Sequence, residues 1–348
     1  MRRITAAVAG LGLLVVALAT GLGAYLSEPG HQGPITDHFD GTTFENTLPT
    51  ALPSVPRGVR YALTRERGHW DDWVEVAPQP DPPLRVQDLR VTFVNHATTL
   101  VQIAGMNLLL DPIWSDRCSA VQWAGPARHH APGLRLDQLP PIDAILISHN
   151  HYDHLDLDTL EALKSHGAPI LTGLGNGDIL RRSGHMDVVE LDWGGEHILG
   201  PLTVIGQEVR HFSSRGLLDR NQTLWLGFVI DSPVGAVYFA GDTGDGPHFA
   251  ESGARQGPFR LAILPIGAFA PRWFMAPVHI DPRAAVAAHQ ALGAQHSVGV
   301  HFGTFRLSDE ARDDPPRLVA EAAAEAGLGP DAFWVLAPGE GRDVPALR

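Results

Sequence analysis

Four side chains of metal-ligand type crowd into one short run of this 348-residue sequence, SHNHYDHLD from Ser148 to Asp156. His149 and His151 stand two residues apart, so in an extended backbone their rings point the same way. Asp153 and His154 follow, where a turn must open the next helix. Imidazole and carboxylate ligands suit zinc or a similar borderline divalent ion. The run therefore predicts a metal site, which would be catalytic if one coordination position stays open.

The spacing HxHxDH resembles the signature of the metallo-β-lactamase superfamily. This resemblance implies three more ligands downstream, and the sequence offers a candidate for each after an apolar or strand-like stretch: His211, Asp242 and His301. The family pattern implies two divalent ions, with zinc as the expected metal. One ion is bound by His149, His151 and His211. The other is bound by Asp153, His154 and His301, and Asp242 bridges the two.

A closer resemblance covers about residues 90–306, where the chain looks like N-acylphosphatidylethanolamine-hydrolysing phospholipase D and its bacterial relatives. The most specific shared stretches are PRWFM at 271–275 and HFGTF at 301–305, and more general ones are NHAT at 95–98 and GDTG at 241–244. Three positions depart from the family pattern. Asn95 stands where glycine is usual, Phe302 where tryptophan is usual, and Val278 where glutamine commonly precedes the histidine that matches His279.

The resemblance implies a hydrolase that cleaves a phosphodiester of N-acylphosphatidylethanolamine-like lipids, giving an N-acylethanolamine and phosphatidic acid. Metal ions lower the pKa of the attacking water in such sites. The residues expected to take part in catalysis are Asp242, Asp153 and His279. For His279, contact with the substrate and a hydrogen-bonded structural role are both open. Asp156 either orients a ligand histidine or caps the following helix.

Two other functions remain open on the sequence alone. The same fold hosts many reactions, so the chain can be a lactonase, an amidase or a different phosphodiesterase. A function of another class is a non-catalytic envelope protein that uses the metal ions for stability. The expected partners are a lipid or another phosphodiester and a membrane surface, and the resemblance also implies a possible homodimer.

The ligands must be positioned by strands that end near one another. Short apolar runs predict strands around 91–94, 100–103 and 108–110, and then at 144–148, 188–191, 224–231, 234–240, 261–265 and 297–301. Helical spacing appears at 157–166, 282–292 and 316–327. Hairpin-rich strands interleaved with a few helices predict an α+β fold, a four-layer αββα sandwich with two sheets face to face and helices outside.

Composition and charge narrow the class of protein. Apolar residues make up 44% of the chain and charged residues 19%, which allows a substantial core. The net charge of −13 repels polyphosphate, so no nucleic-acid partner is expected. Cys118 is the only cysteine in the sequence, so neither an intramolecular disulfide nor a thiolate zinc cluster can form.

The N-terminal residues read as a targeting element. Arg2 and Arg3 precede an uncharged stretch from Ile4 to Ser27, which predicts a signal peptide or an N-terminal membrane anchor over residues 1–27. Either one places the catalytic domain outside the cytoplasm, in the cell envelope of a bacterium-like cell. Residues 28–88 are rich in Pro, Gly and polar residues and are expected to be a linker and irregular lead-in. The hydrolase domain is predicted over residues 89–348.

Overall fold

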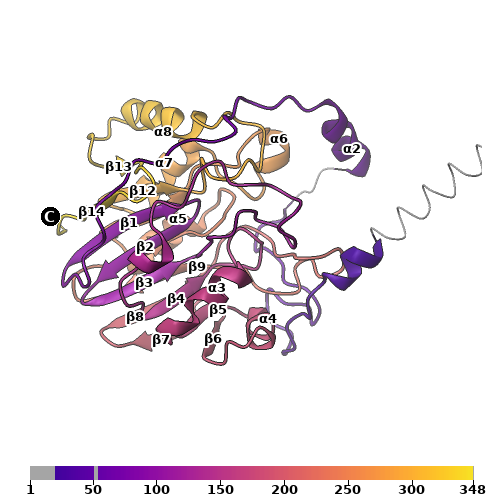
Figure 1. The fold of residues 1–348 in the computed structure, drawn as a ribbon, viewed down its shortest axis with the longest axis horizontal. Coiled ribbons are helices and arrows are strands. Elements are labelled where there is room, and N and C mark those ends of the chain that lie inside the picture. The colour runs from indigo at the N-terminus through magenta and orange to yellow at the C-terminus, as the bar shows by residue number, and fades with distance from the viewer. Residues whose placement is uncertain (1–19, 51–53, 348) are drawn as a thin grey trace, which may run out of the picture.

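Two β-sheets pack face to face in the computed structural model, and helices cover both outer faces (Figure 1). The structure describes residues 20–50 and 54–347. Each sheet has seven strands. This arrangement confirms the predicted α+β, four-layer αββα sandwich.

The bounds of the elements are as follows. The first sheet consists of β1 (Leu89–Asn95), β2 (Thr98–Ile103), β3 (Met106–Leu110), β4 (Ala144–Ile147), β5 (Ile170–Gly173), β6 (Val188–Leu191) and β14 (Gly341–Asp343). The second sheet consists of β7 (Glu196–Leu199), β8 (Leu202–Gln207), β9 (Gly227–Asp231), β10 (Val237–Phe239), β11 (Leu261–Pro265), β12 (His296–Val300) and β13 (Phe333–Trp334). The helices are α2 (Val55–Thr64), α3 (Leu157–Leu163), α4 (Asn176–Arg182), α5 (His248–Gln256), α6 (Arg272–Met275), α7 (Pro282–Ala291) and α8 (Asp314–Glu325), with short 3₁₀ turns at Leu136–Gln138 and Lys164–His166.

Alternation of side chains along each strand builds the layers. In β4, Ala144 and Leu146 face the core between the sheets, whereas Ile145 and Ile147 pack under α3 and α4. Strand β11 alternates in the same way beneath α5, α7 and α8. Because successive residues of a strand point to opposite faces, fully apolar strands of this kind must be covered on both sides. The sequence therefore demands helices outside both sheets.

Parallel strands bring the predicted ligands to one edge. The strand order is β14-β1-β2-β3-β4-β5-β6 in one sheet and β13-β12-β11-β10-β9-β8-β7 in the other. Strands β3 to β6 run parallel, as do β10 to β13. His149 follows β4, Asp242 follows β10 and His301 follows β12. The loops after these carboxyl ends meet at one edge of the sandwich, which is the usual place for a site in open sheets of this kind.

The predicted lead-in packs closely against the domain. Phe39 and Phe44 are 2% and 1% exposed and belong to the core between the sheets. The backbone N–H of Phe44 donates to the carbonyl of Asn221. Helix α2 also lies within residues 28–88, where the sequence indicated no regular element. Part of the segment expected to be a linker thus contributes to the fold.

The predicted signal peptide or anchor lies largely outside the described residues. Of residues 1–27, the structure describes 20–27, and residues 20–25 are helical. Within residues 20–50 and 54–347, no helix is long and apolar enough to cross a membrane.

Candidate metal centre

The residues predicted as metal ligands all lie together where strands of both sheets end. Their ring nitrogens and carboxylate oxygens form overlapping groups whose atoms lie within 4.8 Å of one another: Asp153, His154 and His301 (with His96), then His149, His151 and His211, and then Asp242 with His149 and His154. His151 is half-buried and the others are buried. Asp242 also groups with His211 and His279, which places the predicted catalytic histidine at the same site.

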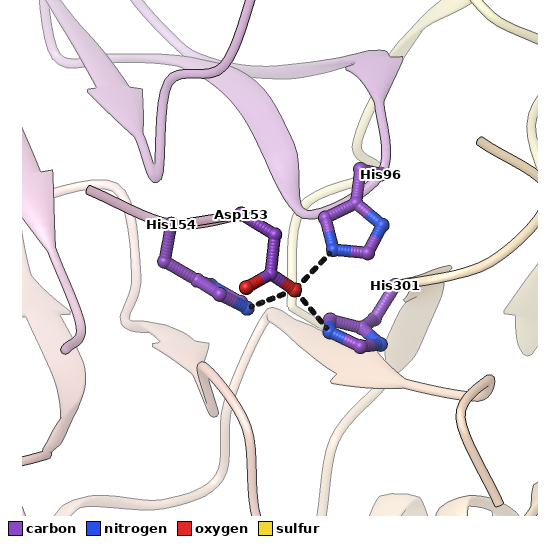
Figure 2. Close-up of side chains that lie close together, drawn as sticks. All are labelled: His96, Asp153, His154 and His301. Carbon is purple, nitrogen blue, oxygen red and sulfur yellow. Dashed lines mark hydrogen bonds and ion pairs between the residues drawn. The ribbon is translucent and has the colours of Figure 1, made fainter. Parts of the chain in front are cut away.

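Four distances between nitrogen and oxygen atoms of this cluster match the spacing of ligands in a tetrahedral site. Asp153 Oδ2 lies 3.4 Å from Nε2 of His154 and 3.3 Å from Nε2 of His301 (Figure 2). Asp242 Oδ2 lies 3.3 Å and 3.1 Å from the same two nitrogens. Ligands bound at about 2.0–2.1 Å to a tetrahedral zinc ion stand about 3.3 Å apart. This part of the cluster therefore has the spacing that one divalent ion requires.

A second set of atoms lies beside the first. His151 Nδ1 lies 2.8 Å from Nε2 of His149 and 3.3 Å from Nε2 of His211. His211 Nε2 is also 3.7 Å from Asp242 Oδ2, the oxygen shared with the first set. Asp242 thus stands between two groups of donors, as a bridging ligand must.

Several buried polar atoms of the cluster have no hydrogen-bond partner in the described part of the chain, as expected of metal ligands. Among the described residues, the buried Nε2 atoms of His154 and His301 and the buried Oδ1 of Asp242 have no hydrogen-bond partner. Buried polar atoms are nearly always paired, because an unpaired one costs its full desolvation energy. The donor set of imidazoles and carboxylates fits divalent ions such as zinc.

Burial and charge divide the histidines into two kinds. Burial lowers the pKa of His151 to about 4 and that of His211 to about 3, and it holds the pKa of His149 well below its usual value. These three rings are neutral at pH 7, and their lone pairs are free for a metal. Burial also opposes the charged form of His154 and His301. The neighbouring carboxylates outweigh it, raising the pKa of His301 to about 9 and that of His154 well above its usual value.

Hydrogen bonds on the far side of the rings fix their orientation. His154 Nδ1–H donates to Asp111 Oδ2 (2.7 Å), and Ser148 Oγ donates to the same oxygen (2.6 Å). Ser148 Oγ in turn accepts from His149 Nδ1–H (2.9 Å). When either ring is neutral, a proton on Nδ1 leaves the Nε2 lone pair pointing into the site.

The carbonyl of Val278 plays the same part for His211, accepting from Nδ1–H at 2.9 Å. The contact uses only the backbone of residue 278. The valine that replaces the usual family glutamine therefore leaves this support of His211 intact.

Three residues at the site were missed by the sequence analysis. His96 Nε2 lies 2.9 Å from Asp153 Oδ2, and Asp111 holds Ser148 and His154 as described. Asn46 brackets a ligand: its Oδ1 accepts from the backbone N–H of His211 (3.1 Å), and its Nδ2 donates to the carbonyl of His211 (2.8 Å). In the sequence, His96 lies within the NHAT stretch at 95–98 that resembles the family, and Asp111 lies in LDPI at 110–113, which the family also shares. Nothing in the sequence marks Asn46.

The two residues whose roles were left open now have definite positions. Asp156 accepts from Ser115 and from the Thr159 hydroxyl. Asp156 does stand at the N-cap position of α3, although its side chain makes no cap bond there. Among the described residues it makes no bond to a ligand histidine. His279 Nδ1 lies 3.9 Å from Asp242 Oδ2 and is buried with no hydrogen-bond partner in the described chain. His279 thus stands beside the centre with a free nitrogen.

Comparisons with known proteins agree with the fold. A profile of the "Beta-lactamase superfamily domain" matches residues 106–302, more than half of the chain. An uncharacterized protein of Mycobacterium tuberculosis is 44% identical over 244 residues, which is 68% of this chain and 65% of that protein. N-acyl-phosphatidylethanolamine-hydrolyzing phospholipase D 1 of Caenorhabditis elegans is 38% identical over 231 residues, 63% of this chain and 65% of that one. The chain thus spans just under two thirds of the length of these relatives.

A third relative is covered almost completely. A UPF0173 metal-dependent hydrolase of Rubrobacter xylanophilus is 30% identical over 259 residues, 72% of this chain and 95% of that protein. Among solved structures, Igni18, a metallo hydrolase from the archaeon Ignicoccus hospitalis, matches with a TM-score of 0.56 and 22% identity over 73% of this chain and 97% of that one, which shows the shared fold. The chain belongs to the metallo-β-lactamase superfamily.

Proposed function

We propose that this chain is a dinuclear phosphodiesterase of the phospholipase D type, which hydrolyses N-acylphosphatidylethanolamine-like lipids to N-acylethanolamine and phosphatidic acid. The observation that carries the proposal is the convergence of two groups of donors on the shared carboxylate of Asp242. The nematode relative named for this reaction, 38% identical, supports the choice of substrate class.

The two donor groups divide the ligands between two ions, which we propose to be zinc. His149, His151 and His211 would hold the first ion, Asp153, His154 and His301 would hold the second, and Asp242 lies within reach of both sets of donors. When bound, the two ions lower the pKa of the attacking water and neutralise charge on the phosphoryl oxygens. Asp242 and Asp153 supply the negative charge that retains the ions, and Asp242 orients the water between the groups.

His279 is the proposed contact for the substrate phosphate. Its Nδ1, unpartnered within the described chain, lies 3.9 Å from Asp242 Oδ2, among the predicted metal ligands. Its backbone is held by the neighbouring Arg272. Arg272 donates to the His279 carbonyl at 2.8 Å and pairs with Asp281 at 3.1 Å. The ring is therefore held at the site by contacts that leave its nitrogen available for a ligand.

Such a lipid substrate lies in a membrane, and we propose that the chain acts at a membrane surface in the cell envelope. Exposed apolar side chains gather where the N-terminal segment reaches the domain: Leu22 and Tyr25 are 54% and 83% exposed, and Leu217 and Leu218 are 60% and 66% exposed. The backbone N–H of Leu217 donates to the carbonyl of Gly23, so the two segments lie side by side. The expected signal or anchor and the homodimer stay predictions.

The test is hydrolysis of N-acylphosphatidylethanolamine in mixed micelles, with metal content measured on the same samples. Wild type and Asp231→Asn, a control on an exposed carboxylate at the end of β9, are expected to turn over the lipid. Asp242→Asn is expected to lose turnover. If metal-replete wild type leaves the lipid intact but cleaves a lactone or an amide, the substrate class is wrong. Inactivity against every ester, amide and phosphodiester would favour a non-catalytic metal protein.

A further inference from the structure

His96 lies at the centre of the cluster without belonging to the predicted ligand set. It is 1% exposed and follows β1 directly. Figure 2 shows its ring beside those of His154 and His301, with all three turned toward the carboxylate of Asp153. The distance from His96 Nε2 to Asp153 Oδ2 is 2.9 Å, the most common length of an N–H···O hydrogen bond.

His96 differs from His154 and His301 in the carboxylates that it contacts. The Nε2 atoms of His154 and His301 lie 3.3 Å and 3.1 Å from the shared oxygen of Asp242. Among the described residues, His96 pairs within 4.0 Å with the carboxylate of Asp153 alone. His96 thus lies within 4.8 Å of the ligand atoms of His154 and His301, but its only carboxylate contact among the described residues is with Asp153. A carboxylate oxygen has two lone-pair sites, so Asp153 Oδ2 can accept from His96 and still bind an ion.

The backbone of His96 is fixed by the segment that carries another ligand. The His96 N–H donates to Thr304 Oγ1 at 2.8 Å, and the His301 N–H donates to the His96 carbonyl at 2.7 Å. His96 also has a left-handed backbone, with φ of 48°. Residues other than glycine rarely adopt this backbone conformation. It persists where surrounding contacts hold it. The segment after β12 of the second sheet thus fixes the backbone of His96. Its ring reaches Asp153, which follows β4 of the first sheet.

We propose that His96 is a positioning residue for the second ion: its Nε2–H holds the Asp153 carboxylate in the orientation that binds the metal. The inference rests on the proposed assignment of ligands to the second ion and is independent of the substrate. Partners of this kind orient a ligand and raise the affinity for the metal, typically by about 10- to 100-fold.

Two substitutions at position 96 separate the hydrogen bond from the volume of the ring. His96→Leu fills the space and removes the donor. His96→Gln places an amide N–H near the position of Nε2. His289→Leu is the control, since His289 is buried on α7 and bonds to Ser297 away from the centre. The readouts are zinc bound per chain and the affinity of each site by competition with a chelator, together with thermal unfolding of each variant.

His96→Leu is expected to keep the first ion and to bind the second about 10- to 100-fold more weakly. His96→Gln is expected to restore most of that affinity, and His289→Leu to bind both ions like wild type. Unchanged affinity in His96→Leu would overturn the proposal. A glutamine variant no better than the leucine variant would also overturn it, because the ring would then act as a direct ligand or as packing.

A second position covers the case in which His96→Leu does not fold. Thr304→Val removes the hydroxyl that fixes the His96 backbone. It is expected to lower the affinity for the second ion less than His96→Leu does, and to leave the affinity for the first ion unchanged. If Thr304→Val binds the second ion as tightly as wild type, the proposal fails. The measurements of zinc binding need no substrate. Failure to cleave the lipid would therefore contradict the proposed function and leave the role of His96 untouched.

Discussion

Residues at the ends of strands hold the centre in shape by unusual backbone conformations. His96, Asp111, Ala268 and His301 have φ values of 48°, 42°, 55° and 62°. Residues with side chains rarely adopt this left-handed region, and such outliers cluster at functional sites. His96, Asp111 and His301 each follow the last residue of a strand directly, so the chain turns abruptly there and aims a side chain into the site.

Substitution of His279 tests whether its free nitrogen contacts the substrate. His279→Ala is expected to retain the metal content of wild type and to lower kcat/KM for N-acylphosphatidylethanolamine by about 10- to 100-fold, the worth of one hydrogen bond to a charged group. His289→Ala is the matched control, a buried histidine on α7. Steady-state kinetics with metal analysis decide the matter. Unchanged kcat/KM, or loss of metal in His279→Ala, would contradict a role in substrate contact.

A buried histidine outside the centre makes stability depend on pH. Burial lowers the pKa of His130 to about 4. Its ring bonds to the carbonyl of Ala131 and to Thr304 Oγ1. In the unfolded chain His130 is protonated near pH 6.5, whereas in the folded chain it is protonated only near pH 4. Stability from this group is therefore complete above pH 6.5 and falls as the pH drops toward 4.

His130→Gln is expected to reduce the loss of unfolding free energy between pH 7 and pH 5 by about 2 kcal/mol, because its side chain does not titrate. Urea unfolding at both pH values measures the difference. His69→Gln is the control, since that side chain is 83% exposed. The same pH dependence in His130→Gln and wild type would show that His130 does not carry the effect.

The sequence allowed part of this site to be foreseen. Residues 149–154 converge because they are neighbours in one turn, so their spacing alone predicts a shared site. His96 reaches Asp153 because β1 and β4 belong to one sheet, and the segment after β12 pairs with His96; both are properties of the folded sheets. Asn46 reaches His211 across 165 positions of sequence, a contact that no local pattern encodes.

At the scale of elements, the lead-in segment contributes to the core. Phe44 lies in the core between the sheets, although it precedes the predicted domain start by many residues. Phe44→Ala is expected to cost about 3–5 kcal/mol of unfolding free energy, since truncation of a buried aromatic leaves a cavity. Leu48→Ala, at a side chain 38% exposed in the same segment, is the control. A loss below about 1 kcal/mol in Phe44→Ala would mean that the segment adds little to the core.

The elements that the sequence analysis missed have physical reasons for escaping it. Helices α4 and α6 have seven and four residues, too few for a clear helical period. Strand β9 begins at Gly227, whereas the apolar run predicted a strand from Leu224. The N–H groups of Leu224 and Leu226 donate to the carbonyls of Leu174 and Ser148 and not to a neighbouring strand of their own sheet. Their apolar character reflects burial between the sheets.

At the scale of the molecule, the centre joins the two sheets. One loop after β4 supplies His149, His151, Asp153 and His154, whereas loops after β8, β10 and β12 supply His211, Asp242 and His301. Ions held by both sets would link the first sheet to the second. Binding to the folded state alone stabilises it by about 4 kcal/mol when the free metal exceeds the dissociation constant 1,000-fold.

Removal of metal therefore has a predicted effect on the whole fold. A chelator is expected to lower the thermal unfolding midpoint of wild type by roughly 10 °C, and added zinc is expected to restore it. Asp242→Asn should show a smaller difference between the two states, because one carboxylate shared by both donor groups is lost. Asp231→Asn, at an exposed position, should behave like wild type. An unchanged midpoint in metal-free wild type would mean that the two sheets hold together at this edge without the ions.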